Sequence, residues 1–475
     1  MVERTDPMGR PSVPILTFLG GAGTVTGSRF LIDTARARVL VDAGLFQGLK
    51  DLRLRNREPF PVDPASIDAV VASHAHVDHI GYVPVLTRDG FTGSIHCTRE
   101  TAELAAIVLP DAGHLQEEEA DYANRKGFSK HHPALPLYTE QDARDSLPRF
   151  RPHPYDDEVE VAPGVHVTLR PAGHILGSAT VTVRLADHDD RRIVFSGDLG
   201  RRHHPILEPP APVGRADVVV MESTYGDRRH DDTHALDAFR DAILRTIGRG
   251  GTVLIPAFAV DRTEVVLYHL QQLVASGQIP EVPVFVDSPM ALSALSVYRS
   301  AIGRVGSATH PALRGLDDVL GGDHVKEVRD VEGSKALADV RTPCIILSAS
   351  GMATGGRVVH HLARLLPSHR NSVLLVGFQA VGTRGRMLAE GADELKMLGR
   401  YVRVRAEIVD LGSFSVHADQ QELLEWLGTA DPPPETVYLV HGEPDAAATL
   451  RELVEGDGRG PQAVAARLGE RVRLD

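Results

Sequence analysis

Cysteine is scarce in this chain, and the apolar segments of exported or membrane-spanning proteins are missing. The 475 residues include 2 cysteines, Cys97 and Cys344, each within an apolar, strand-like stretch. We expect both to be buried packing residues, which excludes a disulfide framework and fits a reducing cytoplasm. No apolar run approaches the roughly 20 residues of a membrane helix. The opening MVERTDPMGRPSVP lacks the apolar core of a secretory signal and is expected to be a flexible tail. These absences favour a cytoplasmic protein without a membrane partner.

An excess of positive charge is also missing. Lys and Arg number 51 against 64 Asp and Glu, which gives a formal net charge of −13. This balance argues against a surface that coats nucleic acid generally, although a polyanionic substrate could still be held at a local site that contains metal ions. The composition, 42% hydrophobic and 24% charged, is typical of a globular protein, and the length predicts two domains.

Glycines gather early in the chain, in FLGGAGTVTGSRFLID (residues 18–33). A dinucleotide-binding loop would need its third glycine at Thr26 and a helix after it. The glycine instead stands at Gly27, and the following residues alternate between apolar and polar as a strand does. We therefore expect a glycine-rich turn between two strands of a hairpin.

The pattern of predicted elements changes near Tyr225. Before it, short stretches rich in Val, Ile and Thr predict strands, and residues 99–109 and 114–127 have helical character. After it, helices alternate with buried strands, which is typical of a mostly parallel sheet covered by helices on both faces. One of these helices is expected to begin at Asp261, with Glu264 completing a capping box.

Metal-capable side chains crowd into VVASHAHVDHIGYVP. After a predicted strand come His74, His76, Asp78 and His79. In a strand-to-helix turn, such groups can divide between two neighbouring metals, and imidazole nitrogen with carboxylate oxygen is the ligand set of hydrolytic zinc sites. The spacing therefore predicts a metal centre rather than a surface histidine cluster.

Three later residues stand where further ligands would be needed. His174 lies between a strand and a glycine turn in RPAGHILGS, Asp198 ends the strand of RIVFSGD, and His441 ends the strand of TVYLVHGE. Each residue alone indicates little, because polar residues are common in the loops that follow strands. Together they form a set at equivalent strand ends, in which the Asp198 carboxylate could bridge two metals.

In their order along the chain, these motifs resemble those of the metallo-β-lactamase fold. They are VLVDAGLFQG with Asp42, the His74–His79 cluster, AGHILGS, FSGDLG and VHGE. The segment after MESTYGDR resembles the β-CASP domain of the nucleic-acid-processing branch, with further matches in IPAFAVDRTE, VDSPMALSA, SASGMATGGR, GFQAVGTRGR and SFSVHADQ. The chain most resembles the bacterial RNA-degrading members and, more distantly, the nuclease that cleaves eukaryotic pre-mRNA 3′ ends.

The resemblance implies an α/β fold, an αββα metallo-β-lactamase sandwich with an inserted β-CASP domain whose mainly parallel sheet is flanked by helices. The expected limits are 1–224 for the first part of the metallo-β-lactamase domain, 225–394 for the β-CASP domain and 395–475 for the second part. One departure is Asp261, where relatives commonly have glycine. We expect it to act as a helix cap.

The resemblance also implies a site for two Zn²⁺ ions per chain. The residues matching the ligands of the first zinc are His74, His76 and His174, and those matching the second are Asp78, His79 and His441. Asp198 would bridge the two ions. Asp42 would orient the imidazole ligands, as metal-bound histidines generally require.

Two further positions match the family's remaining active-site motifs. Glu222 in MESTYG and His417 in FSVHAD would together protonate the leaving oxygen. At position 441 the chain resembles the family members that act on RNA, which have histidine there, whereas DNA-repair members usually have an apolar residue. We expect a zinc-dependent ribonuclease that acts on single-stranded RNA by attack of a metal-activated water and leaves 5′-phosphate and 3′-hydroxyl ends.

Glycine-rich turns of the second domain are candidates for binding substrate phosphates. SASGMATGGR supplies Ser348 and Gly351, and GTRGR supplies Arg384 and Arg386. Such turns are also common in β/α sheets that bind nothing.

Several alternatives stay open at this point. The first is a DNA-directed nuclease of the same architecture, and another is a non-catalytic RNA-processing subunit, which the complete ligand set disfavours. The large inserted domain argues against a small-molecule hydrolase, and the histidine-rich ligand set argues against a di-iron protein. A homodimer is compatible with the sequence, which leaves open whether cleavage is endonucleolytic or exonucleolytic.

Overall fold

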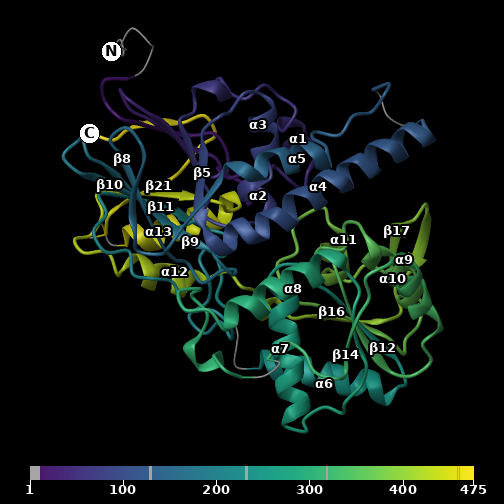
Figure 1. The fold of residues 1–475 in the computed structure, drawn as a ribbon. Coiled ribbons are helices and arrows are strands. Elements are labelled where there is room, and N and C mark those ends of the chain that lie inside the picture. The colour runs from purple at the N-terminus through teal and green to yellow at the C-terminus, as the bar shows by residue number, and fades with distance from the viewer. Residues whose placement is uncertain (1–10, 128–130, 231–233, 317–318, 457, 459) are drawn as a thin grey trace. The chain divides into compact units, whose positions relative to one another are not determined.

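The chain forms two compact units (Figure 1). The computed structural model describes residues 11–127, 131–230, 234–316, 319–456, 458 and 460–475, so residues 1–10 of the expected N-terminal tail lie outside the described part. The first unit comprises Met1–Arg229, Gly306–Ala308 and His417–Asp475, and the second comprises His230–Val305 and Thr309–Val416.

The second unit interrupts the first, as expected of an inserted domain, but the segment between 395 and 416 differs from expectation. It was expected with the first domain, yet β19 (Glu407–Asp410) pairs in parallel with β16 (Ser372–Leu375) of the second unit. Backbone hydrogen bonds between these strands tie that segment to the second unit's sheet. The assignment of functional domains to 1–224, 225–394 and 395–475 stays a prediction.

Two sheets form the first unit. One has the strand order β22-β1-β2-β3-β4-β5-β6, and the other has the order β21-β20-β11-β10-β9-β8-β7. The strands of the first sheet are β1 (Ile15–Phe18), β2 (Phe30–Asp33), β3 (Arg38–Val41), β4 (Ala69–Val71), β5 (Ser94–Thr98), β6 (Phe150–His153) and β22 (Arg471–Arg473). Those of the second are β7 (Glu158–Ala162), β8 (Val165–Pro171), β9 (Ala179–Leu185), β10 (Arg191–Phe195), β11 (Val218–Glu222), β20 (Thr436–Val440) and β21 (Gln462–Ala465).

The two sheets pack face to face around a shared hydrophobic core. Phe18 and Ile32 of the first sheet share a core with Val181 and Phe195 of the second. Because successive side chains of a strand point to opposite faces, the alternating apolar residues of both sheets meet in this layer. The predicted sandwich is confirmed.

Helices cover the outer faces of the sandwich. On the second sheet these are α12 (Gln420–Leu427) and α13 (Pro444–Glu455), which pack against β11 and β20. The other helices of this unit are α1 (Lys50–Arg55), α2 (Val77–Ile80), α3 (Val83–Arg88), α4 (Arg99–Lys126) and α5 (Glu140–Ser146), of which α4 packs against β5 and β6 of the first sheet. The two helical stretches expected between residues 99 and 127 form one 28-residue helix, α4, with Pro110 inside it. Thr98 caps this helix at its start, and Gly127, in the left-handed conformation, ends it.

The glycine-rich segment connects two antiparallel strands, as predicted. β1 pairs with β2, so residues 19–29 form the connection of a hairpin. Gly27 has a φ of +74°, and a Cβ there would lie 2.6 Å from the Phe46 ring, so only glycine fits without strain. The backbone N–H of His441 donates to the Gly21 carbonyl at 2.6 Å, which places this connection against a predicted metal ligand.

The second unit is a parallel sheet with the strand order β14-β13-β15-β12-β16-β19, and the hydrogen-bonded strand pairs recorded in it are parallel. This confirms the predicted alternation of helices and buried strands. The remaining strands are β12 (Thr252–Pro256), β13 (Val284–Val286), β14 (Val325–Glu327) and β15 (Cys344–Ser348), with a separate hairpin of β17 (Glu394–Met397) and β18 (Arg400–Arg403). The helices are α6 (Ala235–Gly248), α7 (Arg262–Ala275), α8 (Pro289–Ile302), α9 (Val331–Ala336), α10 (Arg357–Leu365) and α11 (Arg384–Ala389).

The predicted capping box at the start of α7 is wrong. Asp261 precedes the helix with a φ of +71°, and its side chain makes no capping hydrogen bond to the first turn. The carboxylate instead accepts a hydrogen bond of 2.7 Å from the Tyr298 hydroxyl of α8. The Asp261 side chain, which local sequence rules assign to capping the helix, is therefore bound by the buried Tyr298 hydroxyl instead.

Both cysteines are buried and free, as predicted. Among the described residues, every helix is too short or too polar to span a bilayer.

Candidate metal centre

The predicted metal ligands follow the carboxyl ends of strands that share a direction. β3 runs parallel to β4 in one sheet, and β10, β11 and β20 run parallel to one another in the other. Carboxyl ends of parallel strands meet at one edge of a sheet, which gathers the residues that follow them. Asp42 follows β3, His74 and His76 follow β4, Asp78 and His79 lie in α2, His174 follows β8, Asp198 follows β10, Glu222 ends β11, and His441 follows β20.

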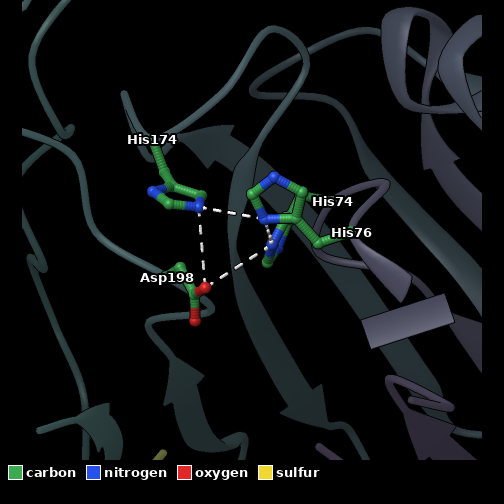
Figure 2. A group of neighbouring side chains, drawn as sticks. All are labelled: His74, His76, His174 and Asp198. Carbon is green, nitrogen blue, oxygen red and sulfur yellow. Dashed lines mark hydrogen bonds and ion pairs between the residues drawn. The ribbon is translucent and has the colours of Figure 1, made fainter. Parts of the chain in front are cut away.

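One metal-capable group combines three imidazoles with a carboxylate (Figure 2). His74, His76, His174 and Asp198 each offer a ligand atom, and these atoms lie within 4.8 Å of one another. His76 Nδ1 is 3.1 Å from His74 Nε2 and 3.2 Å from His174 Nε2. Asp198 Oδ2 is 3.6 Å from Nε2 of both His74 and His174. Three of the residues predicted for one zinc therefore stand together with Asp198.

The other three predicted ligands form a second group. Asp78, His79 and His441 also place their ligand atoms within 4.8 Å of one another. Nε2 of His441 is 3.3 Å from Nε2 of His79 and 3.4 Å from Oδ2 of Asp78. Asp198 Oδ1 lies 3.2 Å from His79 Nε2 and 3.5 Å from His441 Nδ1. The two oxygens of Asp198 thus face different groups.

The donor chemistry of both groups fits a cation. In the first group, neutral imidazole nitrogens that approach one another at 3.1 and 3.2 Å can share few protons between them, so their lone pairs converge on a common point. Among the described residues, His76 Nε2, Asp198 Oδ1 and Glu222 Oε2 are buried without a hydrogen-bond partner. Imidazole nitrogens with a buried carboxylate are the donors that zinc favours, so the residues present fit the metal that the sequence predicts.

Burial and the charges of neighbouring side chains together set the protonation states at this site. Burial lowers the pKa of His74 and of His174 well below the usual histidine range. Burial alone would raise the pKa of Asp198, but the surrounding histidines outweigh it and hold that pKa well below its ordinary value. Burial likewise opposes the charge on His79, whose pKa is nevertheless raised well above normal by Asp198 and Asp42. Neutral His74 and His174 beside the ionised Asp198 are in the states that bind a metal, whereas His79 would give up its proton when a metal binds.

Hydrogen bonds orient two of the imidazoles. Asp42 Oδ2 lies 2.7 Å from His79 Nδ1, which turns Nε2 of that ring toward the second group. Ser73, which sequence reasoning missed, donates to Asp42 Oδ2 at 2.9 Å and lies 3.0 Å from His74 Nδ1. Its position directly before His74 was the available signal. Thr224, also missed, lies 3.2 Å from His441 Nδ1 and follows the MES motif without a spacing that marks it.

Glu222 and His417 lie beside Asp198 rather than within either imidazole group. His417 Nδ1 is 3.4 Å from Glu222 Oε1 and 4.0 Å from Asp198 Oδ2. Glu222 Oε1 also accepts the backbone N–H of Leu199 at 2.6 Å, which fixes the carboxylate. The His417 side chain is 16% exposed, while those of Glu222 and Asp198 are at most 1% exposed. His417 can therefore exchange a proton with solvent.

The predicted phosphate-binding residues lie in the second unit. Ser348 ends β15, and the loop through Gly351 leads into α10, so the expected strand-to-helix turn is present. The Ser348 hydroxyl donates to the Asp287 carbonyl at 3.1 Å. Arg384 donates to the carbonyls of Ala353 and Thr354 at 3.2 and 2.9 Å. Arg386 instead forms an exposed ion pair of 2.6 Å with Glu390. Arg384 thus already holds the loop through its backbone carbonyls, and Ser348 is bound to the carbonyl that follows β13.

Three protein families match the chain along its length. The metallo-β-lactamase superfamily matches residues 22–247, the β-CASP domain matches residues 263–388, and the Zn-dependent metallo-hydrolase RNA specificity domain matches residues 401–466. The chain belongs to the β-CASP branch of the metallo-β-lactamase superfamily. This confirms the family and the fold that the sequence motifs predicted.

Similar proteins include a bacterial ribonuclease and archaeal termination factors. Ribonuclease TTHA0252 of Thermus thermophilus is 36% identical over 454 residues, covering 95% of this chain and 98% of that protein. Transcription termination factor FttA of Methanosarcina mazei is 32% identical over 462 residues, covering 92% of this chain and 68% of the factor. A crystal structure of a protein of unknown function from Enterococcus faecalis V583 has a TM-score of 0.54 at 15% identity, covers 97% of this chain and 100% of its own, and supports the fold.

Proposed function

We propose that this chain is a zinc-dependent ribonuclease that hydrolyses phosphodiester bonds of single-stranded RNA with water and leaves 5′-phosphate and 3′-hydroxyl ends. The observation that carries the proposal is the position of Asp198 between two metal-capable groups, with Oδ2 near His74 and His174 and Oδ1 near His79 and His441. A carboxylate shared in this way suits a pair of metal ions, which is the arrangement that assists phosphoryl hydrolysis.

Seven residues would hold two zinc ions. The first would be held by His74, His76 and His174, the second by Asp78, His79 and His441, with Asp198 between them. Bound there, the ions would supply an acidified water and offset negative charge on the phosphoryl oxygens. Asp42 keeps the proton of His79 on Nδ1, and Ser73 holds the ring of His74 in place.

His417 is the proposed donor of the proton that the leaving ribose oxygen requires. Its Nδ1 lies 3.4 Å from Glu222 Oε1, and its side chain is the more exposed member of the pair. Glu222, fixed by the Leu199 N–H, orients the imidazole. His417 then passes the proton to the departing oxygen and recovers one from solvent.

RNA is favoured over DNA as the substrate by two observations. Residues 401–466 match an RNA specificity domain, and this segment contains both His417 and His441. The relative from Thermus thermophilus, which aligns over 95% of this chain, is named a ribonuclease.

Matched RNA and DNA strands of one sequence test the proposal. Each strand is labelled at the 5′ end in one sample and at the 3′ end in another, then incubated with the zinc-loaded chain and with Asp198→Ala as a control for contaminating nuclease. We expect cleavage of RNA into products with 5′-phosphate ends, and the two labels report where along the strand the cuts fall. Faster cleavage of DNA, or equal cleavage by the Asp198→Ala protein, would contradict the proposal.

The second unit would contribute phosphate contacts through backbone N–H groups near Gly351 and through Arg386, which faces solvent in its pair with Glu390. Ser348 and Arg384 would then shape the loop rather than contact phosphate directly, because their side chains are bound to backbone carbonyls. The homodimer and the cytoplasmic location stay predictions.

A further inference from the structure

A cavity of about 460 Å³ lies in the first unit, away from the core between its sheets. Thr17 of β1 and Leu31 of β2 pair across the strands and both line the cavity. Their neighbours Phe18 and Ile32 point into the core between the sheets. Because side chains alternate along a strand, the cavity opens on the outer face of the first sheet. None of the described metal-capable residues lines it.

The lining of this cavity carries an excess of positive charge. Four arginines, Arg29, Arg38, Arg55 and Arg471, face two carboxylates, those of Asp33 and Glu58. Arg38 is already paired with Asp33 at 2.6 Å. The whole chain is acidic, so a local cluster of arginines contrasts with the rest of the protein and favours an anionic occupant.

Arg29 is the most unusual member of this lining. It is 4% exposed, and its guanidinium donates to the Gly44 carbonyl at 2.7 Å and to Asn56 Oδ1 at 3.1 Å. Its central carbon lies 4.0 Å from the centre of the Tyr82 ring. These partners are neutral, and within the described part of the chain no carboxylate pairs with Arg29. A buried guanidinium without a counter-ion is costly, and burial lowers its pKa to about 10.

Aromatic and apolar side chains complete the lining. Phe60 is half-buried, and its ring stacks on Tyr82 with centres 5.6 Å apart and an angle of 26°. Arg55 lies over the Phe46 ring at 5.6 Å. A flat apolar group and an anion can therefore be held side by side in this cavity, the former by ring stacking and the latter by guanidinium groups.

We propose that this cavity binds one nucleotide unit, with its phosphate at Arg29 and Arg55 and its base against Phe60. The volume of the cavity falls within the roughly 300–1,000 Å³ of small-molecule sites. The same unit can come from a free nucleoside monophosphate or from a nucleotide of an RNA strand. The cavity is inferred from its own residues, and only the choice of a nucleotide among flat anions rests on the proposed function.

Titration calorimetry on the zinc-loaded full-length chain tests the proposal with adenosine monophosphate, adenosine and inorganic phosphate. Arg55→Gln is expected to weaken binding of the monophosphate about tenfold, the size expected of one charge-assisted hydrogen bond. Phe60→Leu is expected to weaken it by a similar factor through lost stacking. Arg53→Gln on the same helix is the matched control, because Arg53 is exposed and does not line the cavity. Thermal melts check that each variant folds.

An oligoadenylate strand, added to the slowly cleaving His417→Ala protein, identifies the source of the nucleotide. Displacement of the monophosphate by the strand supports a nucleotide of RNA as an occupant, and failure to displace it supports the free nucleotide. Binding that is equal in Arg55→Gln, Phe60→Leu and Arg53→Gln proteins, or phosphate binding as tight as the monophosphate, overturns the proposal. RNA cleavage measured in parallel separates the two ideas, because cleavage without nucleotide binding overturns the cavity alone, and nucleotide binding without cleavage overturns the proposed function alone.

Discussion

Asp198 lies between the two imidazole groups, because each of its carboxylate oxygens faces a different group. Asp198→Ala removes both oxygens, so the first group keeps imidazoles alone and the second keeps Asp78 as its carboxylate. We expect RNA hydrolysis to fall by more than about 10³-fold and bound zinc to decrease. Elemental analysis of the purified variant, beside Asp89→Ala as an exposed surface control, measures the zinc. Normal zinc in Asp198→Ala would contradict its position between the two ions.

His417 should separate proton transfer from metal binding. It lies beside Glu222 and outside both imidazole groups, so His417→Ala is expected to retain zinc while cleavage slows by about 10²–10⁴-fold, the usual contribution of a general acid. The measurement is the rate of cleavage of labelled RNA at matched zinc content. Loss of zinc from this variant would show instead that His417 is a ligand.

At the scale of single elements, strands β5 and β6 carry a histidine pair that makes the fold sensitive to acid. His96 Nδ1 of β5 is 2.8 Å from His153 Nε2 of β6, with the rings stacked at 11°. Burial, with His153 and Arg151 adding to it, lowers the pKa of His96 to about 4. Burial also lowers the pKa of His153, which Asp157 partly offsets.

The sign of this effect follows from proton counting. An unfolded histidine titrates near about 6.5, so between about pH 6.5 and about pH 4 the unfolded chain binds more protons at His96 than the folded chain does. The free energy of unfolding therefore falls as the pH drops through this window. His96→Asn removes the titrating group, and we expect it to reduce the loss by about 1 kcal/mol between about pH 7 and about pH 4.5. Urea unfolding of both proteins, each freed of metal by chelation, measures the difference, and parallel pH curves would refute the prediction.

Helices α7 and α8 are linked by the hydrogen bond from Tyr298 to Asp261. Tyr298→Phe leaves the buried carboxylate without this hydroxyl donor, and we expect it to destabilise the protein by about 1–2 kcal/mol. Adding Asp261→Gly removes the carboxylate and relieves the positive φ, so the double variant should recover part of that loss. Urea unfolding of the single and double variants completes a double-mutant cycle. Additive losses would show that the hydrogen bond contributes nothing.

The elements that could be predicted from the sequence are those in which burial sets the pattern of apolar and polar residues. Strands such as β11, with five buried residues in a row, can be recognised in the sequence as apolar runs. β14 has no buried residue in its three positions and lies at a sheet edge, so its pairing depends on a partner that the local sequence does not encode. The metal-capable residues could be predicted because histidine and aspartate bind metals and their spacing in the sequence matches a set of metal ligands. Ser73 and Thr224 were not, since a hydroxyl acquires its role only from what the fold places beside it.

At the scale of the whole molecule, the metal chemistry is concentrated in one unit. Among the described residues, the two imidazole groups and the cluster of Asp198, Glu222 and His417, which could also hold a metal, all lie in the first unit. The single tryptophan of the chain, Trp426, lies in the same unit on α12. It is buried, packs in the cluster that contains Met221 and Leu439, and donates its indole N–H to the Ala211 carbonyl at 2.9 Å. Tryptophan fluorescence therefore reports unfolding of the unit that carries the metal centre.

Chelation should lower the melting temperature reported by Trp426. A metal that binds the folded unit and not the unfolded chain adds about 4 kcal/mol of stability when its free concentration is about a thousandfold above the dissociation constant. For a unit of this size, that amounts to a shift of about 10 °C. Fluorescence melts with zinc and with chelator measure it, and the Asp198→Ala protein, expected to hold less zinc, should shift less. A Trp426 transition that does not move after zinc removal, verified by elemental analysis, would mean that β11 and β20 are held at their carboxyl ends without help from the metal.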